Sequence, residues 1–427
     1  MKGGEVDIAR SIFDTYILPI RTSKQQEKRG NTYTIFEAQV RPITRHFNVL
    51  IDGYSSLNER EPNNFTSSEK HVTPLEHCNA LYETMIASNI KPDVYTISSL
   101  MGLQEKSFSV TTLWQKAMEL DIPMTPPLYH SLIMAYGRAN DPSSACYIFD
   151  RMINTHSLSN TLNSWNVLLS ALSQISRKEG KVPLACLESS AYNIGKSLET
   201  KELNERLLPG GYSFLNMVDG KDVTNASFEI LQTMKDATFN EDFKSWILRP
   251  NSQTYCLVAS IISRRGQKDG NKAMELYHDA MQWNIPADGR FINAVIRSFG
   301  NDIDGAIQRW KTDLRLAVAS YENRERPEYS KHKKGKNLIA AYHGLINVAG
   351  KAGRPDIALR IIYAMKKDGL EPNESTLNSY KTGARENREE KSIRLKNQYE
   401  NLLIVECTKY SQLDKRRSSE KRVRIII

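Results

Sequence analysis

Apolar residues recur along the chain at the three- and four-residue spacing that marks one face of an amphipathic helix. The clearest instance is the stretch 339–373, where Tyr342, Leu345, Ile346 and Ala349 share one face of a first predicted helix. A second predicted helix follows in the same stretch. A helix pair this short cannot bury both apolar faces by itself, so a chain built of such pairs has to stack them.

The second helix of this stretch has clear start and stop signals. Pro355 suits a first helical position, where its missing N–H costs nothing, and Gly369 suits the residue that ends a helix. Between them Ala358, Ile361 and Ile362 line the apolar face. The stretch therefore predicts a helix, a short turn and a second helix of similar length.

The same pattern repeats along most of the chain. Second helices share a small residue followed three and four positions later by larger, mostly apolar ones: Ala9/Ile12/Phe13, Cys78/Leu81/Tyr82, Val110/Leu113/Trp114, Ala145/Ile148/Phe149, Ser227/Ile230/Leu231, Ala273/Leu276/Tyr277 and Ala306/Arg309/Trp310. First helices share an apolar quartet: Phe47/Leu50/Ile51/Tyr54, Tyr129/Leu132/Ile133/Tyr136, Trp165/Leu168/Leu169/Leu172 and Tyr255/Val258/Ala259/Ile262. Arg309 is the weakest fit, because it stands where an aliphatic residue belongs.

Several of the predicted pairs close on a proline followed, directly or one residue later, by Asp or Asn. These turns are 89–93, 248–251, 284–288 and 369–373. With these turns and first-helix openings such as 45–51, the chain resembles the pentatricopeptide repeat (PPR) proteins from Gly3 to about Tyr380. The resemblance implies an all-α fold, a right-handed α-solenoid of stacked helix-turn-helix repeats with insertions. The related tetratricopeptide repeat, which binds proteins, lacks this ending.

The spacing of the turns predicts the domain organisation. Residues 1–43 form a partial N-terminal repeat, with a second helix only, and a linker, which we interpret as truncation of the chain. Seven repeats follow over 44–373: 44–93, 94–125, 126–161, 162–251 with a long insertion, 252–288, 289–338 with a basic insertion, and 339–373. Residues 374–410 form a partial repeat and a capping helix, and 411–427 a basic, disordered tail. A polar loop is expected from Ser55 to about Thr73.

The resemblance also implies candidate binding residues. In this family each repeat reads one base of single-stranded RNA through its fifth and its last residue. Carried over, the pairs are Asn48 with Asp93, Ser98 with Thr125, His130 with Thr161, Asn166 with Asn251, Cys256 with Asp288, Asn293 with Leu338, and His343 with Asn373. Asn378 opens the final partial repeat. By the resemblance, Asn with Asp suggests uracil and Asn with Asn suggests cytosine, whereas the Leu338 side chain cannot form a hydrogen bond at all.

Charge agrees with a polyanionic partner. The net charge is +9 and the sequence pI is near 9.1. Two basic clusters are candidates for phosphate contacts, although most such runs are simply solvated loops or tails: Lys331, Lys333, Lys334 and Lys336 in the insertion, and Lys415, Arg416 and Arg417 in the tail. The five cysteines include no CxxC pair, so neither a metal site nor a cofactor is expected. No apolar run is long enough for a membrane helix.

The sequence favours a binding protein over an enzyme, since it carries no phosphate-binding glycine loop and none of the deaminase or metallonuclease motifs that accompany PPR repeats elsewhere. Two functions stay open. In the first, the chain binds organellar single-stranded RNA, mRNA or rRNA, and acts in its processing, stability or translation. In the second, it is a scaffold of an organellar ribonucleoprotein such as the mitochondrial ribosome, contacting protein subunits or folded rRNA. The resemblance implies a mitochondrion or plastid as its location, although no targeting segment is visible.

Overall fold

The computed structural model describes residues 3–14, 42–60, 73–155, 161–175, 214–218, 221–239, 248–264, 269–324, 335–385 and 402–404. The described residues are helical, with no β-strand among them. The chain divides into two compact units, which are described separately. Unit 1 comprises Met1–Ile175 and Lys181–Lys221, and unit 2 comprises Ser176–Gly180 and Asp222–Ile427.

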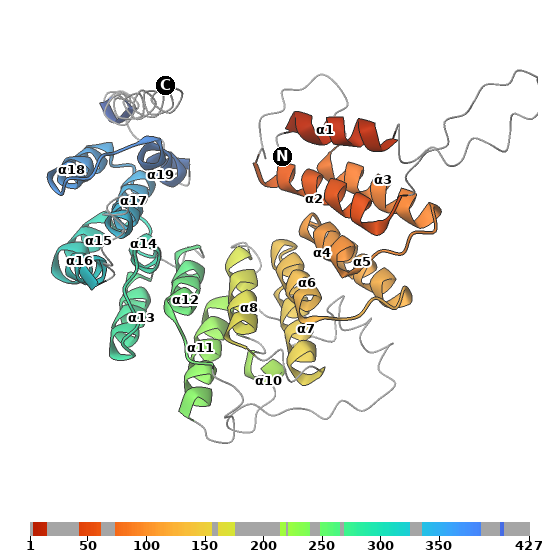
Figure 1. Cartoon of the computed structure of the whole chain (residues 1–427). Coiled ribbons are helices and arrows are strands. Elements are labelled where there is room, and N and C mark those ends of the chain that lie inside the picture. Colours follow the sequence, from red (N-terminus) through yellow and green to blue (C-terminus); the bar gives the residue numbers. More distant parts are fainter. Residues whose placement is uncertain are drawn as a thin grey trace, which may run out of the picture. The chain divides into compact units, whose positions relative to one another are not determined.

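Unit 1 is a stack of helix pairs (Figure 1). Its helices are α1 (Gly3–Ile12), α2 (Thr44–Arg60), α3 (Pro74–Ala87), α4 (Val94–Gly102), α5 (Ser107–Glu119), α6 (Pro126–Arg138), α7 (Pro142–Thr155), α8 (Leu162–Gln174) and α10 (Phe214–Val218). The first helices α2, α4, α6 and α8 contact one another in order, and each of α3, α5 and α7 contacts the first helix of its own pair and that of the next.

Unit 2 repeats this arrangement. Its helices are α11 (Val223–Phe239), α12 (Ser252–Arg264), α13 (Gly270–Gln282), α14 (Gly289–Arg297), α15 (Ile303–Arg309), α16 (Arg315–Arg324), α17 (Lys336–Lys351), α18 (Pro355–Lys367) and α19 (Glu374–Arg385). A π-helical turn, η6 (Trp310–Leu314), joins α15 to α16. The first helices α12, α14, α17 and α19 pack in sequence, so the predicted all-α solenoid of stacked helix pairs is confirmed.

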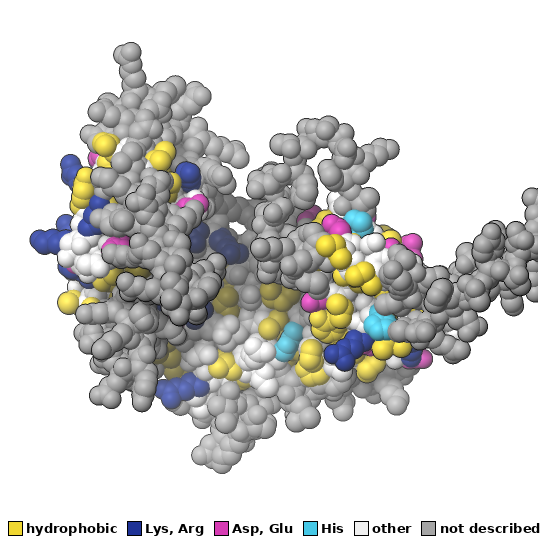
Figure 2. All heavy atoms as spheres, turned by 45° about the horizontal axis from the view of Figure 1, so that its top comes forward, with side chains coloured by type: hydrophobic (Ala, Val, Ile, Leu, Met, Phe, Trp, Pro, Cys, Tyr) yellow, Lys and Arg dark blue, Asp and Glu magenta, His cyan; other side chains and the backbone are white. Residues whose placement is uncertain are grey.

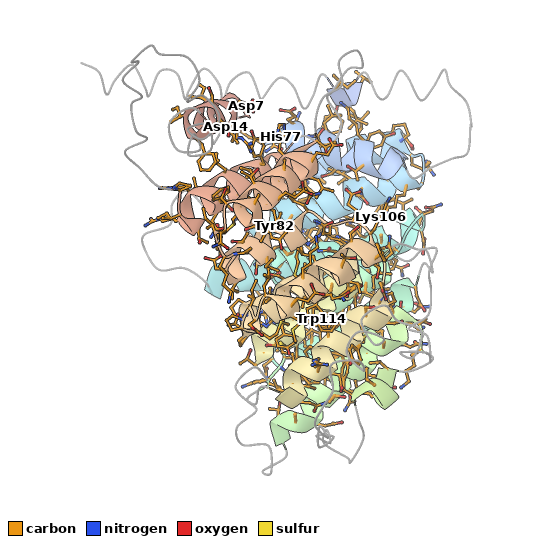
Figure 3. All side chains as sticks on the ribbon, turned by 90° about the vertical axis from the view of Figure 1, so that its right-hand side faces the viewer. Asp7, Asp14, His77, Tyr82, Lys106 and Trp114 are labelled. Carbon is orange, nitrogen blue, oxygen red and sulfur yellow. The ribbon has the colours of Figure 1, made fainter. Side chains whose placement is uncertain are left out.

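The predicted apolar positions form the core. All five first-helix quartets are buried, and the large second-helix residues fill the seam to the next pair, as Tyr82 on α3 and Trp114 on α5 do in unit 1 (Figure 3). Edge-to-face aromatic contacts recur in these seams, for example Phe149 with Trp165 at a centroid distance of 5.0 Å. Ile12 is an exception. Phe13 packs on Phe47 of α2, whereas Ile12 stays 51% exposed on a face of α1 that α2 does not cover.

A recurrent polar cluster provides hydrogen-bond acceptors for two buried tyrosines of unit 2. The Tyr255 hydroxyl on α12 donates to Asp279 of α13 at 2.9 Å, and Lys235 of the preceding second helix, α11, pairs with the same carboxylate at 2.5 Å. Tyr342, Asp368 and Arg315 repeat this arrangement on α17, α18 and α16. Burying a hydroxyl group without a hydrogen-bond partner costs free energy. The second helix of the same pair supplies the acceptor carboxylate, and the second helix of the preceding pair supplies a cation that pairs with this carboxylate.

Helix boundaries differ from the expected ones at two places. Helix α2 continues to Arg60, so the polar loop expected from Ser55 begins as helix. Helix α17 begins at Lys336, three residues before Ile339, after Gly335 at φ 88°. Asn337 anchors the extra turn, because its side-chain oxygen accepts a hydrogen bond from the Gly289 N–H of α14 at 3.1 Å.

Several sequence-based expectations fall outside the described residues. The linker at 21–41, the remaining loop at 61–72, the insertions at 176–213 and 325–334, and the tail at 411–427 all lie there. Of the capping helix only 402–404 are described, with Leu403 buried and Leu402 half exposed. The repeat boundaries themselves stay a prediction.

First helices approach closely where glycine leaves room. A Cβ atom on Gly137 of α6 would stand 2.6 Å from the backbone oxygen of Ala171 on α8. A methyl group there forces the two helices apart, whereas a Cβ on Gly102, at the end of α4, meets no atom within 4 Å.

Replacing Gly137 therefore tests this contact. Gly137→Ala is expected to lower the free energy of unfolding of unit 1 by about 1–3 kcal/mol, measured by urea denaturation followed by circular dichroism. Gly102→Ala is the matched control, because it adds the same methyl group in open space, and it is expected to be neutral or slightly stabilising. Equal effects of the two variants would contradict the close packing of α6 on α8.

Candidate nucleic-acid interface

Each candidate fifth residue directly follows a buried apolar residue of a first helix. Asn48 follows Phe47 on α2, and His343 follows Tyr342 on α17. Successive residues on a helix point about 100° apart. The apolar side chain therefore enters the core while its neighbour lies at the edge of the seam between consecutive first helices. Asn48 is only 7% exposed, so its side chain lies between the two helices and not on their outer surface.

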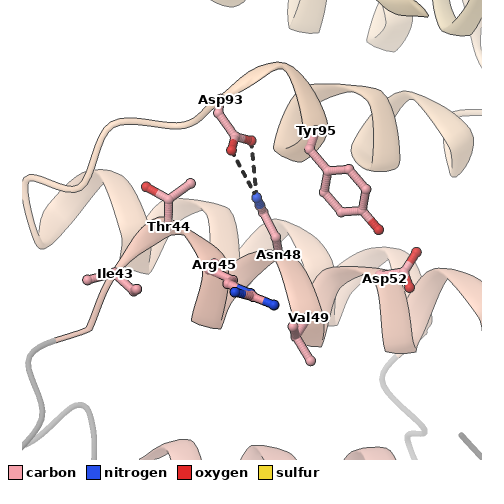
Figure 4. A pocket seen from close by; sticks show the side chains of 8 residues that line it. All are labelled: Ile43, Thr44, Arg45, Asn48, Val49, Asp52, Asp93 and Tyr95. Atoms are coloured by element: carbon pink, nitrogen blue, oxygen red, sulfur yellow. Dashed lines mark hydrogen bonds between the residues drawn. The ribbon is translucent and has the colours of Figure 1, made fainter.

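Asn48 and Asp93 come together in unit 1, although 45 positions separate them (Figure 4). The Asn48 Nδ2 group donates to both carboxylate oxygens of Asp93, at 3.1 and 3.2 Å. Asp93 is also the N-cap of α4, where Oδ1 accepts from the Thr96 N–H at 2.8 Å. The Thr96 hydroxyl lies 2.6 Å from Asn48 Oδ1, to which it donates.

These bonds fix the orientation and the charge of the pair. An amide flip would place Asn48 Oδ1 against the Asp93 carboxylate, so the donor side faces Asp93. Burial disfavours the charged form of Asp93, but the hydrogen bonds from Thr96 and Asn48 outweigh it and hold the pKa of Asp93 below its usual value. One Asn48 N–H and the Asp93 carboxylate remain available to a ligand.

An open pocket of about 670 Å³ lies over this pair. Its lining includes the six side chains Ile43, Arg45, Asn48, Val49, Asp93 and Tyr95. Tyr95 is 51% exposed, and it lies on the opposite side of Asn48 from Arg45 in the view of Figure 4. A flat aromatic ring, a planar guanidinium and a hydrogen-bonding pair thus surround one hollow.

The two histidine positions use the same seam. His130 Nε2 lies 3.0 Å from Ser164 Oγ of α8, and His343 Nε2 lies 3.1 Å from Thr376 Oγ1 of α19. Burial lowers the pKa of both imidazoles, because the charged form loses hydration. Thr161 and Asn373, the last residues paired with these histidines by sequence, bond the same two hydroxyl residues.

The remaining pairs are less regular. Asp288 caps α14, and burial, helped by the Asp288 charge, raises the pKa of the Cys256 thiol to about 11. The side-chain oxygens of Thr125 and Asn293 are buried without a hydrogen-bond partner among the described residues, and Ser98 makes no described bond to Thr125. Leu338 lies in the extra turn of α17.

Three further asparagine positions complete the list. Asn166 is 4% exposed on α8 of unit 1, and Asn251 bonds Thr254 at the start of α12 in unit 2. Asn378 is exposed on α19. Because Asn166 and Asn251 lie in different units, they are described singly.

The structure adds one set of residues that the sequence analysis missed. In several first helices the third residue is Ser or Thr, and it forms a hydrogen bond with the residue that caps the same helix. In three cases its hydroxyl group also forms a hydrogen bond with the fifth residue of the preceding first helix. These residues are Thr96, Ser164, Thr254 and Thr376. A signal was present, since each stands three positions after Asp, Asn or Thr, the spacing of a helix N-cap.

Cationic side chains are distributed along the first helices. Of the predicted phosphate contacts, Lys336 is exposed in the first turn of α17, and the others lie outside the described residues. Last-turn cations occur at the ends of four first helices: Arg138, Arg264, Arg297 and Lys351. On the face that Figure 2 shows, cationic, acidic, histidine and apolar side chains are interspersed.

The described residues contain no group of three or more His, Cys, Asp or Glu side chains able to hold a metal ion. None of the described helices is both long and apolar enough to cross a bilayer.

The chain is thus a helical repeat protein with a row of polar residues between its first helices. A pentatricopeptide repeat domain model matches residues 336–380, and a PPR repeat model matches residues 128–154. These matches fall on α17–α19 and on α6–α7, and the same helix pair recurs in both units. The two matched segments are therefore pentatricopeptide repeats.

Solved structures of PPR proteins are also similar to the chain. PPR10 from maize is 14% identical with a TM-score of 0.34, over 99% of this chain and 57% of PPR10. PPR10 in complex with an 18-nt psaJ RNA element is 15% identical with a TM-score of 0.27, over 89% of this chain and 50% of PPR10. The chain spans about half the length of these PPR10 chains. No curated protein matches it.

The shared hydroxyl predicts a measurable effect on stability. Thr96→Val is expected to lower the free energy of unfolding by about 1–2 kcal/mol, because α4 loses a capping interaction and Asn48 Oδ1 loses its donor. Thr96→Ser keeps the hydroxyl and is expected to retain most of this stability. The measurement is the urea midpoint of both variants, and identical midpoints would show that the hydroxyl bond does not contribute.

Proposed function

We propose that this protein binds single-stranded RNA along its first helices, with one base against each seam that carries a suitable polar pair. The Asn48–Asp93 pair in its open pocket carries the proposal. The matches of residues 336–380 and 128–154 to pentatricopeptide repeat models support it.

The pocket supplies the two interactions that single-stranded RNA recognition needs. Tyr95 and Arg45 offer planar groups on which a base stacks, with a free energy of roughly 1–3 kcal/mol per base. Below them the free Asn48 N–H is a donor and Asp93 an acceptor. A base edge with a carbonyl oxygen next to a ring N–H is complementary, and among pyrimidines this edge is that of uracil.

The protein acts, in this proposal, as a non-enzymatic binder in processing, stability or translation of an organellar mRNA or rRNA. Lys336 and Arg264, both exposed on first helices, supply sequence-independent phosphate contacts that weaken with salt. The organellar setting, a mitochondrion or a plastid, is proposed from the resemblance to the pentatricopeptide repeat proteins.

One observation favours the scaffold alternative for part of the row. Asn293 pairs by sequence with Leu338, which has no polar side-chain atom, and Asn293 Oδ1 is buried without a partner among the described residues. This seam offers little for base recognition. A protein subunit or folded rRNA is the alternative occupant of such seams.

The Asn48 position provides the direct test. RNA ligands are selected from a randomised single-stranded pool, and the position at which Asn48→Ala changes base preference is identified. Wild type is expected to prefer uracil there, and Asn48→Ala to weaken binding of the selected RNA by about tenfold, because one base-specific contact is lost.

The control for this test is Asn79→Ala. Asn79 is exposed on the second helix α3, so the same chemical change is made away from the seam, and RNA affinity is expected to stay unchanged. If wild type enriches no RNA from the pool, or if both variants reduce affinity equally, base recognition by the first helices is ruled out and the scaffold function is favoured.

A further inference from the structure

A small pocket lies between two second helices of unit 2, apart from the seams between first helices. Helices α11 and α13, which both contact the first helix α12 (Figure 1), supply all of its lining residues. Its volume is about 160 Å³. This is less than the roughly 300–1,000 Å³ of pockets that enclose a small-molecule ligand. The size therefore fits a single side chain of a larger partner.

The pocket has an apolar floor and a polar rim. Leu231 of α11 and Leu276 of α13 form the floor and are buried, and Phe228 beside them is half-buried. Gln232 of α11 and Glu275 of α13 stand at the rim and are exposed. An apolar centre within a polar rim is the arrangement that receives an anchor side chain in protein–protein contacts.

The corresponding grooves between second helices of unit 1 are covered by a cation. Lys116 Nζ of α5 lies 5.8 Å from the centre of the Tyr82 ring of α3. Arg151 Cζ of α7 lies 6.0 Å from the centre of the Trp114 ring of α5. Figure 3 labels both rings. Each long cationic side chain thus closes the groove by lying over the aromatic residue of the preceding second helix.

The same position of α13 carries the opposite charge. Lys116 and Arg151 each stand six positions after the small residue of their second helix. Counted from Ala273, the sixth position of α13 is Asp279. Leu231 of α11 stands where the covered rings stand in α3 and α5. The groove between α11 and α13 therefore lacks both the covering cation and the ring, and its apolar floor stays open.

Lys235, the cation among the lining residues, is directed inward. It is 8% exposed, and its ammonium group pairs with Asp279 at 2.5 Å. The same group lies 5.5 Å from the centre of the Trp283 ring and 5.9 Å from that of Tyr255. A carboxylate and two aromatic faces thus compensate this charge inside the protein. The rim carboxylates set the charge that a partner meets.

This rim is acidic, although the whole chain has a net charge of +9. Glu275 is exposed and forms no hydrogen bond or ion pair with a described residue. Asp236, one turn after Gln232, is also exposed and accepts a hydrogen bond from its side chain at 2.8 Å. The nearby Lys272 is paired with Asp269 at 3.7 Å. Such a rim repels a polyanion such as RNA and attracts a cation.

We propose that the pocket between α11 and α13 docks a basic segment of a partner protein, which inserts one apolar side chain between the two helices and places a Lys or Arg against Glu275. The open floor receives the apolar group, and the acidic rim selects the neighbouring cation. Because this surface is separate from the proposed row of RNA contacts on the first helices, the protein can hold RNA and a protein partner at the same time. The proposal does not depend on RNA binding.

The probe for this surface is a displayed pool of random peptides, selected on the full chain. The enriched peptides are expected to share an apolar residue with a nearby Lys or Arg. One such peptide is then synthesised with a fluorescent label, and its affinity is measured by fluorescence anisotropy at low and at high salt. Part of the binding is expected to weaken with salt, because the rim contact is exposed.

Variants at two exposed rim positions locate the contact. Glu275→Lys replaces an attraction by a repulsion and is expected to weaken peptide binding about five- to tenfold at low salt. Gln232→Trp places a large ring over the pocket and is expected to abolish binding. Changing the peptide's cation to Glu is expected to restore affinity for the Glu275→Lys variant.

Glu83→Lys is the matched control, because Glu83 is exposed on the second helix α3 of unit 1. It makes the same charge change away from the pocket and is expected to leave peptide affinity unchanged. Circular dichroism checks that each variant remains folded.

Three results would overturn the proposal. The first is a pool that yields no peptide, or only peptides without a cation. The second is a peptide whose affinity does not fall in Glu275→Lys and Gln232→Trp, or falls equally in Glu83→Lys. The third is displacement of the peptide by single-stranded RNA, which would place the peptide on the first helices.

Discussion

The contact between consecutive first helices is the interaction on which the rest of each unit depends. Phe47, Trp165 and Tyr342 enter the core from these helices, and glycine at Gly137 lets neighbouring backbones come close. The residue that follows each buried aromatic side chain is thereby held at the edge of the seam. The same helix thus supplies the core residues and the proposed base-contacting residues, and the packing of the core sets the position of the latter.

A second constraint acts through the helix caps. Asp93 accepts a hydrogen bond from the Thr96 N–H at the start of α4 and also accepts from Asn48, so a group that stabilises the helix also orients the Asn48 side chain. Asn373 and Thr376 do the same for His343. Because a backbone N–H can only donate, a cap bond of this kind also fixes which side of an amide faces the helix. The fold itself therefore holds the side chains of Asn48 and His343 in place.

Much of the fold could be predicted, because helical periodicity is a local property. The quartet at Tyr255 and the triplet at Cys78 are buried as predicted, and Pro355 starts α18 as its fixed backbone angle requires. The two predictions that were wrong also have physical causes. Ile12 is exposed because burial depends on what covers a helix face, and α17 starts early because Asn337 bonds α14, a contact between residues 48 positions apart.

The sequence by itself determined the helix pairs, their order and the positions of Asn48 and His343, since spacing along one chain encodes which face of a helix a residue occupies. It did not determine what those side chains present to a ligand. That was decided by Thr96 and Thr376, which reach them only once the next pair is stacked in place. Which side-chain groups are left to donate or accept a hydrogen bond depends on the bonds between neighbouring helices. Only the tertiary structure brings those partners together.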